Sequence, residues 1–227
     1  MRTAAILPVK SFAAAKQRLS PTLGSGSRQA LALAMVSDVL GALRRVDGVE
    51  EVFVVTAERT VEAAARGGRV RVLHDPAETG QSSATGIGID RAAAEGFERV
   101  VLIPGDTPLL DPRELDVLLA RAEEQSLDVA IVPDRHGAGT NALVLRPPHA
   151  ITPSFGPGSL KRHVTAAEQA SLRFEVVEIP SLMHDVDDPA DLHDLSAALD
   201  ERRGHAPLTQ GALRQLGRMR AAPPVEV

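Results

Sequence analysis

Four groups of polar residues along this chain could take part in phosphate chemistry, and the central one surrounds Asp106. That residue follows the apolar run Val100–Ile103 and a Pro-Gly turn. A short run that is apolar on both faces is typical of a central strand in a parallel sheet, and ligands bind beyond the carboxyl ends of such strands. A carboxylate there could hold a metal ion on a phosphorylated ligand, or it could only satisfy the amides of its own turn.

A basic group follows the apolar segment Thr3–Val9. Lys10, Lys16 and Arg18 come within nine residues of that segment. Fixed cations after a first strand would neutralise the charge of a triphosphate. A solvated basic loop is the other interpretation of the same spacing.

An acidic group precedes the last expected core helix. Asp188 and Asp191 fit the capping positions of a helix that begins at Pro189, whereas Asp185 and Asp187 lie before the cap. Alternate residues of an extended segment share one face, so these two carboxylates could approach one divalent cation. A solvated acidic loop remains the alternative.

The fourth group consists of loops of small residues. Gly139-Thr140 offers a backbone amide and a hydroxyl, and the segment Ser154–Ser159 opens a helix that carries Lys161, Arg162 and His163 near its start. Loop amides, a serine hydroxyl and the positive end of a helix together could hold a phosphate or carboxylate. Basic residues at that end oppose the helix dipole, which an anionic ligand would compensate.

Two further polar features are weaker. The segment Glu78–Gly88 is predicted to be a loop that opens a helix ending near Gly96, and the hydroxyls of Ser82 and Ser83 could contact a base edge or a ribose. A flexible loop with a serine cap is the alternative, and the glycines do not follow the dinucleotide-binding spacing. His136 could be catalytic, although an isolated loop histidine is more often solvated.

These groups are positioned by a predicted α/β fold, a mostly parallel sheet with helices on both faces in the manner of a Rossmann-like domain. Residues 1–203 are expected to form one domain, followed by a C-terminal tail, 204–227, that is weakly helical around Ala212–Met219. The other expected strands are Val49–Thr56, Val70–Leu73, Asp128–Pro133, Ala142–Leu145 and Arg173–Ile179. The other expected helices are one capped by Ser27 that reaches about Arg45, Thr60–Arg66, and one capped by Asp111 with Glu114 at the capping-box position.

Composition excludes several classes of protein. The chain has 227 residues, of which 44% are hydrophobic and 2% aromatic, a net charge of −5 and no cysteine. These values argue against nucleic-acid binding, thiol catalysis and disulfides. No apolar run reaches the length of a signal peptide or a membrane span, so we expect a cytoplasmic protein without a membrane partner. A homodimer is compatible with the sequence.

The motifs also carry a resemblance to a known family. They are L-P-V-K-S-F-A-A-A-K-Q-R-L at 7–19, P-G-D-T-P-L-L at 104–110, G-T-N-A-L at 139–143, F-G-P-G-S at 155–159 and D-V-D-D-P-A-D-L at 185–192. Together they resemble the CofC/FbiD-type guanylyltransferases of coenzyme F-420 biosynthesis, which are nucleotidyltransferases with a GT-A-like fold. The resemblance covers about Arg2 to Leu199. The motif around Asp106 is widespread, and the combination of G-T-N with F-G-P-G-S is more specific.

The resemblance implies a reaction in which GTP and phosphoenolpyruvate, or 2-phospho-L-lactate, are joined with loss of pyrophosphate in the presence of Mg²⁺. It implies that the acceptor is held by Thr140, Gly156 and Ser159, and magnesium by Asp106, Asp185 and Asp187. Pro8, Lys10, Lys16, Ser82 and Ser83 are the expected nucleotide-binding residues, and Lys10, Lys16 and Asp106 the expected catalytic ones. The acceptor phosphate is already ionised, so the reaction would need positioning and charge neutralisation rather than a general base.

One segment departs from the family pattern. Gly80-Gln81-Ser82-Ser83 stands where family members usually have a G-L-N-type turn. This segment is more similar to molybdenum-cofactor transferases, so a molybdenum-cofactor or sugar-phosphate nucleotidyltransferase is an alternative. A catalytically silent nucleotide-binding module on the same fold is another alternative.

Overall fold

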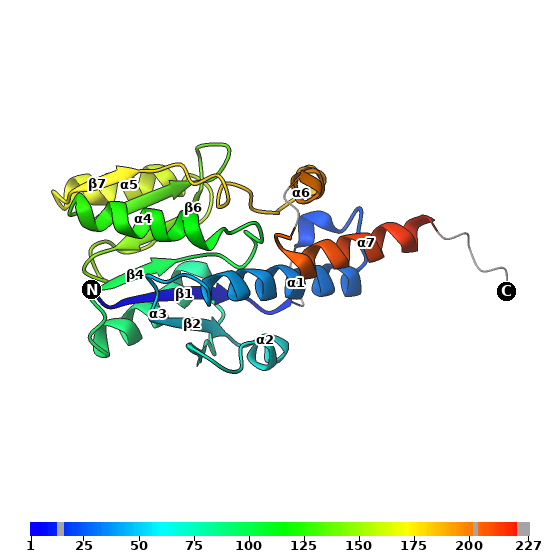
Figure 1. The fold of residues 1–227 in the computed structure, drawn as a ribbon, viewed down its shortest axis with the longest axis horizontal. Coiled ribbons are helices and arrows are strands. Elements are labelled where there is room, and N and C mark those ends of the chain that lie inside the picture. The colour runs from blue at the N-terminus through cyan, green and yellow to red at the C-terminus, as the bar shows by residue number, and fades with distance from the viewer. Residues whose placement is uncertain (13–15, 202–203, 222–227) are drawn as a thin grey trace.

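The computed structural model of the chain describes residues 1–12, 16–201 and 204–221, and its centre is a seven-stranded sheet (Figure 1). The strand order is β3-β2-β1-β4-β6-β5-β7. The strands are β1 (Thr3–Val9), β2 (Glu51–Thr56), β3 (Val70–His74), β4 (Arg99–Leu102), β5 (Val129–Pro133), β6 (Thr140–Leu145) and β7 (Phe174–Val176). The predicted α/β fold is therefore confirmed.

The sheet is mostly parallel, with one antiparallel strand. β6 runs antiparallel to both of its neighbours, β4 and β5, and the other pairs are parallel. Because β6 begins at the edge where the parallel strands end, Thr140 lies at the same edge as the residues after β1 and β4. One strand reversal thus brings a loop from the second half of the chain to the ligand-binding edge.

Helices cover both faces of the sheet. They are α1 (Ser25–Leu43), α2 (Arg59–Ala64), α3 (Gln81–Ala94), α4 (Pro112–Glu124), α5 (Ser159–Gln169), α6 (Pro189–Glu201) and α7 (Pro207–Ala221). α1 and α4 pack on one face and α3 and α5 on the other. In β1, Leu7 belongs to the first core and Ile6 to the second, which explains why this strand is apolar throughout.

The C-terminal helix packs on the domain. α7 lies along α1 (Figure 1), and the carboxylate of Asp38 in α1 accepts hydrogen bonds from the amides of Leu208 and Thr209. Leu213 and Leu216 pack against a third apolar cluster formed by α1, α6 and the segments around Leu19 and Val186. This helix is longer than the weakly helical stretch predicted for the tail. Among the described residues, no helix combines the length and apolar character needed to cross a membrane.

Four local predictions were wrong. α1 begins at Ser25 with Gly24 as its N-cap, so Ser27 lies inside the helix. α3 begins at Gln81, and the expected loop up to Gly88 is mostly helical, because packing on the sheet overrides the weak helix propensity of Gly and Ser. The last expected strand is limited to β7. Asp111 does cap α4, but Glu114 accepts from the amide of Ser181 and not from its own cap residue.

Candidate active site

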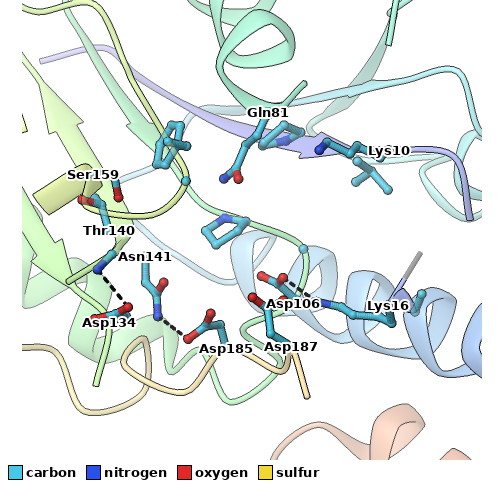
Figure 2. Close-up of a pocket in the computed structure, with 18 of the residues that line it drawn as sticks. Lys10, Lys16, Gln81, Asp106, Asp134, Thr140, Asn141, Ser159, Asp185 and Asp187 are labelled. Carbon is cyan, nitrogen blue, oxygen red and sulfur yellow. Dashed lines mark hydrogen bonds and ion pairs between the residues drawn. The ribbon is translucent and has the colours of Figure 1, made fainter. Parts of the chain in front are cut away.

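A cavity of about 950 Å³ lies at the carboxyl end of the parallel strands. Most of the predicted site residues line it: Pro8, Lys10, Lys16, Asp106, Thr140, Gly156, Ser159, Asp185 and Asp187. They come from six separate segments of the chain. Figure 2 shows Thr140 and Ser159 at one side of the cavity and Asp106, Asp187 and Lys16 at the other.

The acidic side of the cavity is built around the ammonium group of Lys16. Its Nζ lies 2.6 Å from Oδ2 of Asp106 and 3.2 Å from Oδ1 of Asp187 (Figure 2). The backbone of Lys16 is left-handed, with φ 52°, a conformation that is uncommon for a residue other than glycine. Asp106 and Asp187, which are 81 residues apart in the sequence, thus share one lysine. Asp106 and the later acidic segment therefore lie close together, as the sequence predicted.

The electrostatics of this side follow from burial and from charge. Burial alone would lower the pKa of Lys16, but the nearby charges of Asp106 and Asp187 outweigh it and raise the pKa. Burial raises the pKa of Asp185, and the negative charge of Asp106 raises it further. Arg18 also contributes positive charge, with Nη1 3.7 Å from Oδ2 of Asp187. The three carboxylates still outnumber these two cations, so the group favours an additional cation.

The predicted magnesium ligands are not arranged as a ready metal site. Among residues 1–12, 16–201 and 204–221, no three side chains of the metal-binding types are grouped so that they could hold an ion together. The physical reason is that Lys16 lies between Asp106 and Asp187. The donor chemistry nevertheless fits Mg²⁺, which binds through one or two carboxylates together with substrate phosphates.

The opposite side of the cavity presents hydroxyl groups at the start of α5. Ser159 is the first residue of α5 and is buried, as is Thr140 at the start of β6. Gly156 (φ 106°) and Gly158 (φ 73°) adopt positive φ angles that let the loop turn directly into the helix. Thr140 Oγ1 lies 3.0 Å from Nδ1 of His163 in α5. The result is a pocket with hydroxyl donors at the positive end of a helix, with the carboxylate of Asp134 beside it held by the amides of Ala138 and Gly139.

Two of the three basic residues near the start of α5, Arg162 and His163, have a structural explanation, whereas Lys161 is exposed. Burial and the charge of Arg162 lower the pKa of His163 to about 4, so His163 is neutral and not the cation expected from the sequence. Arg162 donates hydrogen bonds to backbone carbonyls of the preceding loop, from Ser154 to Pro157. These contacts hold the loop, and Arg162 does not line the cavity.

The two serines predicted to bind the nucleotide do not line the cavity. Ser82 accepts a hydrogen bond from the amide of Phe155, which ties α3 to the loop before α5, and Ser83 is exposed. Gln81 and Ala84 of the same helix line the cavity instead, and the side chain of Gln81 points toward its interior in Figure 2. The difference arises because α3 begins at Gln81, so the two serines lie inside the helix. Successive residues of a helix point about 100° apart, so neighbouring residues face in different directions.

A comparison with family models identifies the chain. The model described as "Guanylyl transferase CofC like" matches residues 3–215. The chain belongs to this family. The match includes the first part of α7, so it extends beyond the Leu199 limit of the sequence resemblance.

Relatives in this family are similar over nearly their whole length. The chain is 50% identical to a phosphoenolpyruvate guanylyltransferase of Conexibacter woesei, over 95% of this chain and 97% of the relative. It is 37% identical to a 2-phospho-L-lactate guanylyltransferase of Methanothermobacter thermautotrophicus, over 86% of this chain and 84% of the relative.

Solved structures support the fold. A nucleotidyl transferase from Methanothermobacter thermautotrophicus has a TM-score of 0.63 at 20% identity, covering 89% of this chain and 99% of that one. A 4-diphosphocytidyl-2C-methyl-D-erythritol synthase from Anaerococcus prevotii has a TM-score of 0.57 at 14% identity, covering 88% and 96%. The family member described here therefore shares the nucleotidyltransferase fold.

Two residues with clear positions in the site were not assigned a role from the sequence. Asn141 donates from Nδ2 to Oδ1 of Asp185 at 3.2 Å and to the carbonyl of Leu182 at 2.9 Å, so it holds the acidic segment against β6. Asp134 accepts from the amides of Ala138 and Gly139 and shapes the turn before Thr140. The G-T-N motif contained Asn141, but its contact with Asp185, 44 residues further along the chain, is seen only in the folded structure.

Proposed function

We propose that this protein transfers a guanylyl group from GTP to phosphoenolpyruvate and releases pyrophosphate, with 2-phospho-L-lactate as the alternative acceptor. The family membership and the names of its relatives support a guanylyltransferase. The observation that carries the proposal is that one cavity combines a charged side suited to a metal-bound triphosphate with a hydroxyl-lined side suited to a small anion.

The charged side would bind the triphosphate. Lys10 is exposed at the cavity and Lys16 lies deeper, so the two ammonium groups can contact different phosphates. When GTP enters, its phosphates can replace the carboxylates as partners of Lys16. That exchange would free Asp106 and Asp187, with Asp185 beside them, to hold Mg²⁺. The ion would supply charge neutralisation for the triphosphate and the leaving pyrophosphate.

The hydroxyl-lined side would bind the acceptor. Thr140 and Ser159 offer hydroxyl donors, and Gly156 and Gly158 of the loop before α5 let an anion approach the start of that helix closely. A phosphate oxygen of the acceptor would attack the α-phosphorus of GTP, and the bond from that phosphorus to the β-phosphate bridge would break. Because the attacking oxygen is already ionised, these residues need only hold it in line.

The decisive experiment is a pyrophosphate-release assay that crosses GTP, ATP and CTP with four acceptors. The acceptors are phosphoenolpyruvate, 2-phospho-L-lactate, 3-phosphoglycerate and molybdopterin. We expect release with GTP and one of the first two acceptors. Release with molybdopterin or with CTP would support the other nucleotidyltransferase classes, and nucleotide binding without release would support a silent module.

Substitution of Asp106 tests the metal-binding role. Asp106→Asn should lower turnover by a factor of 100 or more, because it removes a charged ligand while keeping the shape of the side chain. Asp111→Asn is the matched control, since asparagine also caps a helix and Asp111 lies outside the cavity lining. Unchanged turnover of a folded Asp106→Asn variant would refute the role.

A further inference from the structure

The imidazole of His163 occupies a fully buried place directly behind the acceptor side of the cavity. None of its surface is exposed. Its Nδ1 lies 3.0 Å from Oγ1 of Thr140, and its Nε2 accepts a hydrogen bond of 2.8 Å from the amide of Ser154. The ring of Phe155 contacts it edge-on at 5.3 Å between centroids. His163 itself does not line the cavity.

These contacts fix where the protons are. The amide of Ser154 can only donate, so Nε2 of His163 must carry a lone pair. The ring is neutral near pH 7, because burial and the charge of Arg162 lower its pKa to about 4. The one ring proton therefore lies on Nδ1 and is donated to Thr140 Oγ1.

The direction of this hydrogen bond determines what Thr140 can do. A hydroxyl whose oxygen accepts from His163 still has its own proton to donate. Among the described residues, His163 is the hydrogen-bond partner of the Thr140 side chain. Thr140 also lines the cavity beside Ser159. Its proton is thus directed to a group that enters from the cavity, and an anion is the matching partner.

We propose that His163 is a positioning residue that keeps the Thr140 hydroxyl as a hydrogen-bond donor toward an anionic group of the acceptor substrate. This inference rests on the proposed function, because it assigns the acceptor to this side of the cavity. The alternative is that His163 only fills the core beneath α5.

Two substitutions of His163 separate these roles, because each keeps one of its hydrogen bonds. Asparagine can place an amide N–H near the position of Nδ1, and glutamine can place an acceptor oxygen near Nε2. We expect His163→Gln to raise the KM for phosphoenolpyruvate about tenfold with little change in the KM for GTP, because one hydrogen bond to a charged group is lost. His163→Asn should recover most of that loss.

A double-variant comparison and a stability control complete the kinetic test. In the Thr140→Val background, His163→Gln should have no further effect on the KM for phosphoenolpyruvate. Val164→Ala removes core packing from the next residue of α5 and should leave that KM unchanged while it lowers the melting temperature. Additive effects of the two substitutions, or a KM that follows stability across all variants, would overturn the proposal.

A direct readout of the ring does not depend on any variant. In the wild-type protein, long-range 1H–15N correlation should show the His163 ring neutral at pH 7, with the proton on Nδ1. A proton on Nε2, or a doubly protonated ring, would contradict the proposal. If the wild-type protein releases no pyrophosphate with any acceptor while the ring has the expected tautomer, the proposed function fails and the geometry of His163 stands. Binding of phosphoenolpyruvate by calorimetry, compared between wild-type and His163→Gln, then decides the role of His163.

Discussion

At the scale of single residues, the cavity separates two ways of binding negative charge. Its acidic side uses formal charges, in which Lys16 is shared between Asp106 and Asp187. Its other side uses neutral donors, the hydroxyls of Thr140 at the start of β6 and of Ser159 at the start of α5. A triphosphate with a metal ion needs the first arrangement, whereas a small acceptor gains specificity from the second.

The neutral state of His163 predicts a pH dependence of stability. Its pKa is about 4 in the folded chain, below the ordinary histidine value of about 6.5, so between these values the unfolded chain binds more protons. The contribution of His163 to the free energy of unfolding is therefore fully present above pH 6.5 and is lost as the pH falls toward 4. Between pH 7 and pH 5 this residue should account for a loss of about 2 kcal/mol in the free energy of unfolding.

Urea unfolding of wild-type and His163→Gln protein at several pH values measures this effect. The stability difference between the two should become smaller by about that amount between pH 7 and pH 5. His193→Gln is the control, because His193 is exposed in α6. The free energy of unfolding of this variant should change with pH as it does in the wild-type protein. Parallel pH profiles for wild-type and His163→Gln would show that His163 is not held neutral by folding.

At the scale of elements, the strands were more predictable than the helix starts. The apolar runs of β1 and β4 are buried on both faces, so their sequences are unbroken and easily recognised. The helix α3 was partly missed because its Gly and Ser residues have low helix propensity. What favours the helix there is its contact with β1, a contact between distant residues that no local pattern contains.

Two glycines of α3 test this explanation. A Cβ atom on Gly88 would lie 2.5 Å from Cγ2 of Ile6 in β1, whereas one on Gly86 would meet nothing within 4 Å. Gly88→Ala should therefore lower the free energy of unfolding by about 1–3 kcal/mol through overpacking. Gly86→Ala should raise it by up to about 1 kcal/mol, because alanine is the better helix former. Denaturant unfolding of both variants checks the pair, and a stabilised Gly88→Ala would mean that α3 does not pack closely on β1.

The candidate site was predictable in its residues but not in its arrangement. The motifs around Asp106, Thr140 and Asp185 indicated which side chains to consider. The antiparallel direction of β6, which brings Thr140 to the same edge as Asp106, could not be derived from the sequence of that strand alone. The position of Lys16 between two carboxylates also depends on backbone placement, since it adopts a left-handed conformation.

At the scale of the whole molecule, the C-terminal helix is connected to the acidic side of the cavity through the third apolar cluster. Val186 belongs to this cluster and lies between Asp185 and Asp187 in the sequence. Leu19, three residues after Lys16, belongs to it as well. Leu213 and Leu216 of α7 pack against the same cluster from outside. The apolar packing of α7 therefore supports the two segments that carry these charges.

Shortening the chain tests this connection and also the expectation of a domain at 1–203 with a tail at 204–227. Removal of residues 205–227 should lower the free energy of unfolding by about 3–5 kcal/mol, because it exposes the cluster under α7. It should also speed amide hydrogen exchange at Val186 more than at β1, where the core is untouched. Leu213→Ala should reproduce part of both effects, whereas Leu208→Ala, on an exposed position of the same helix, should stay within about 0.5 kcal/mol of wild type. A shortened chain with wild-type stability and exchange would show that residues 205–227 are a dispensable tail, and the support of the acidic segment would then come from α1 and α6 alone.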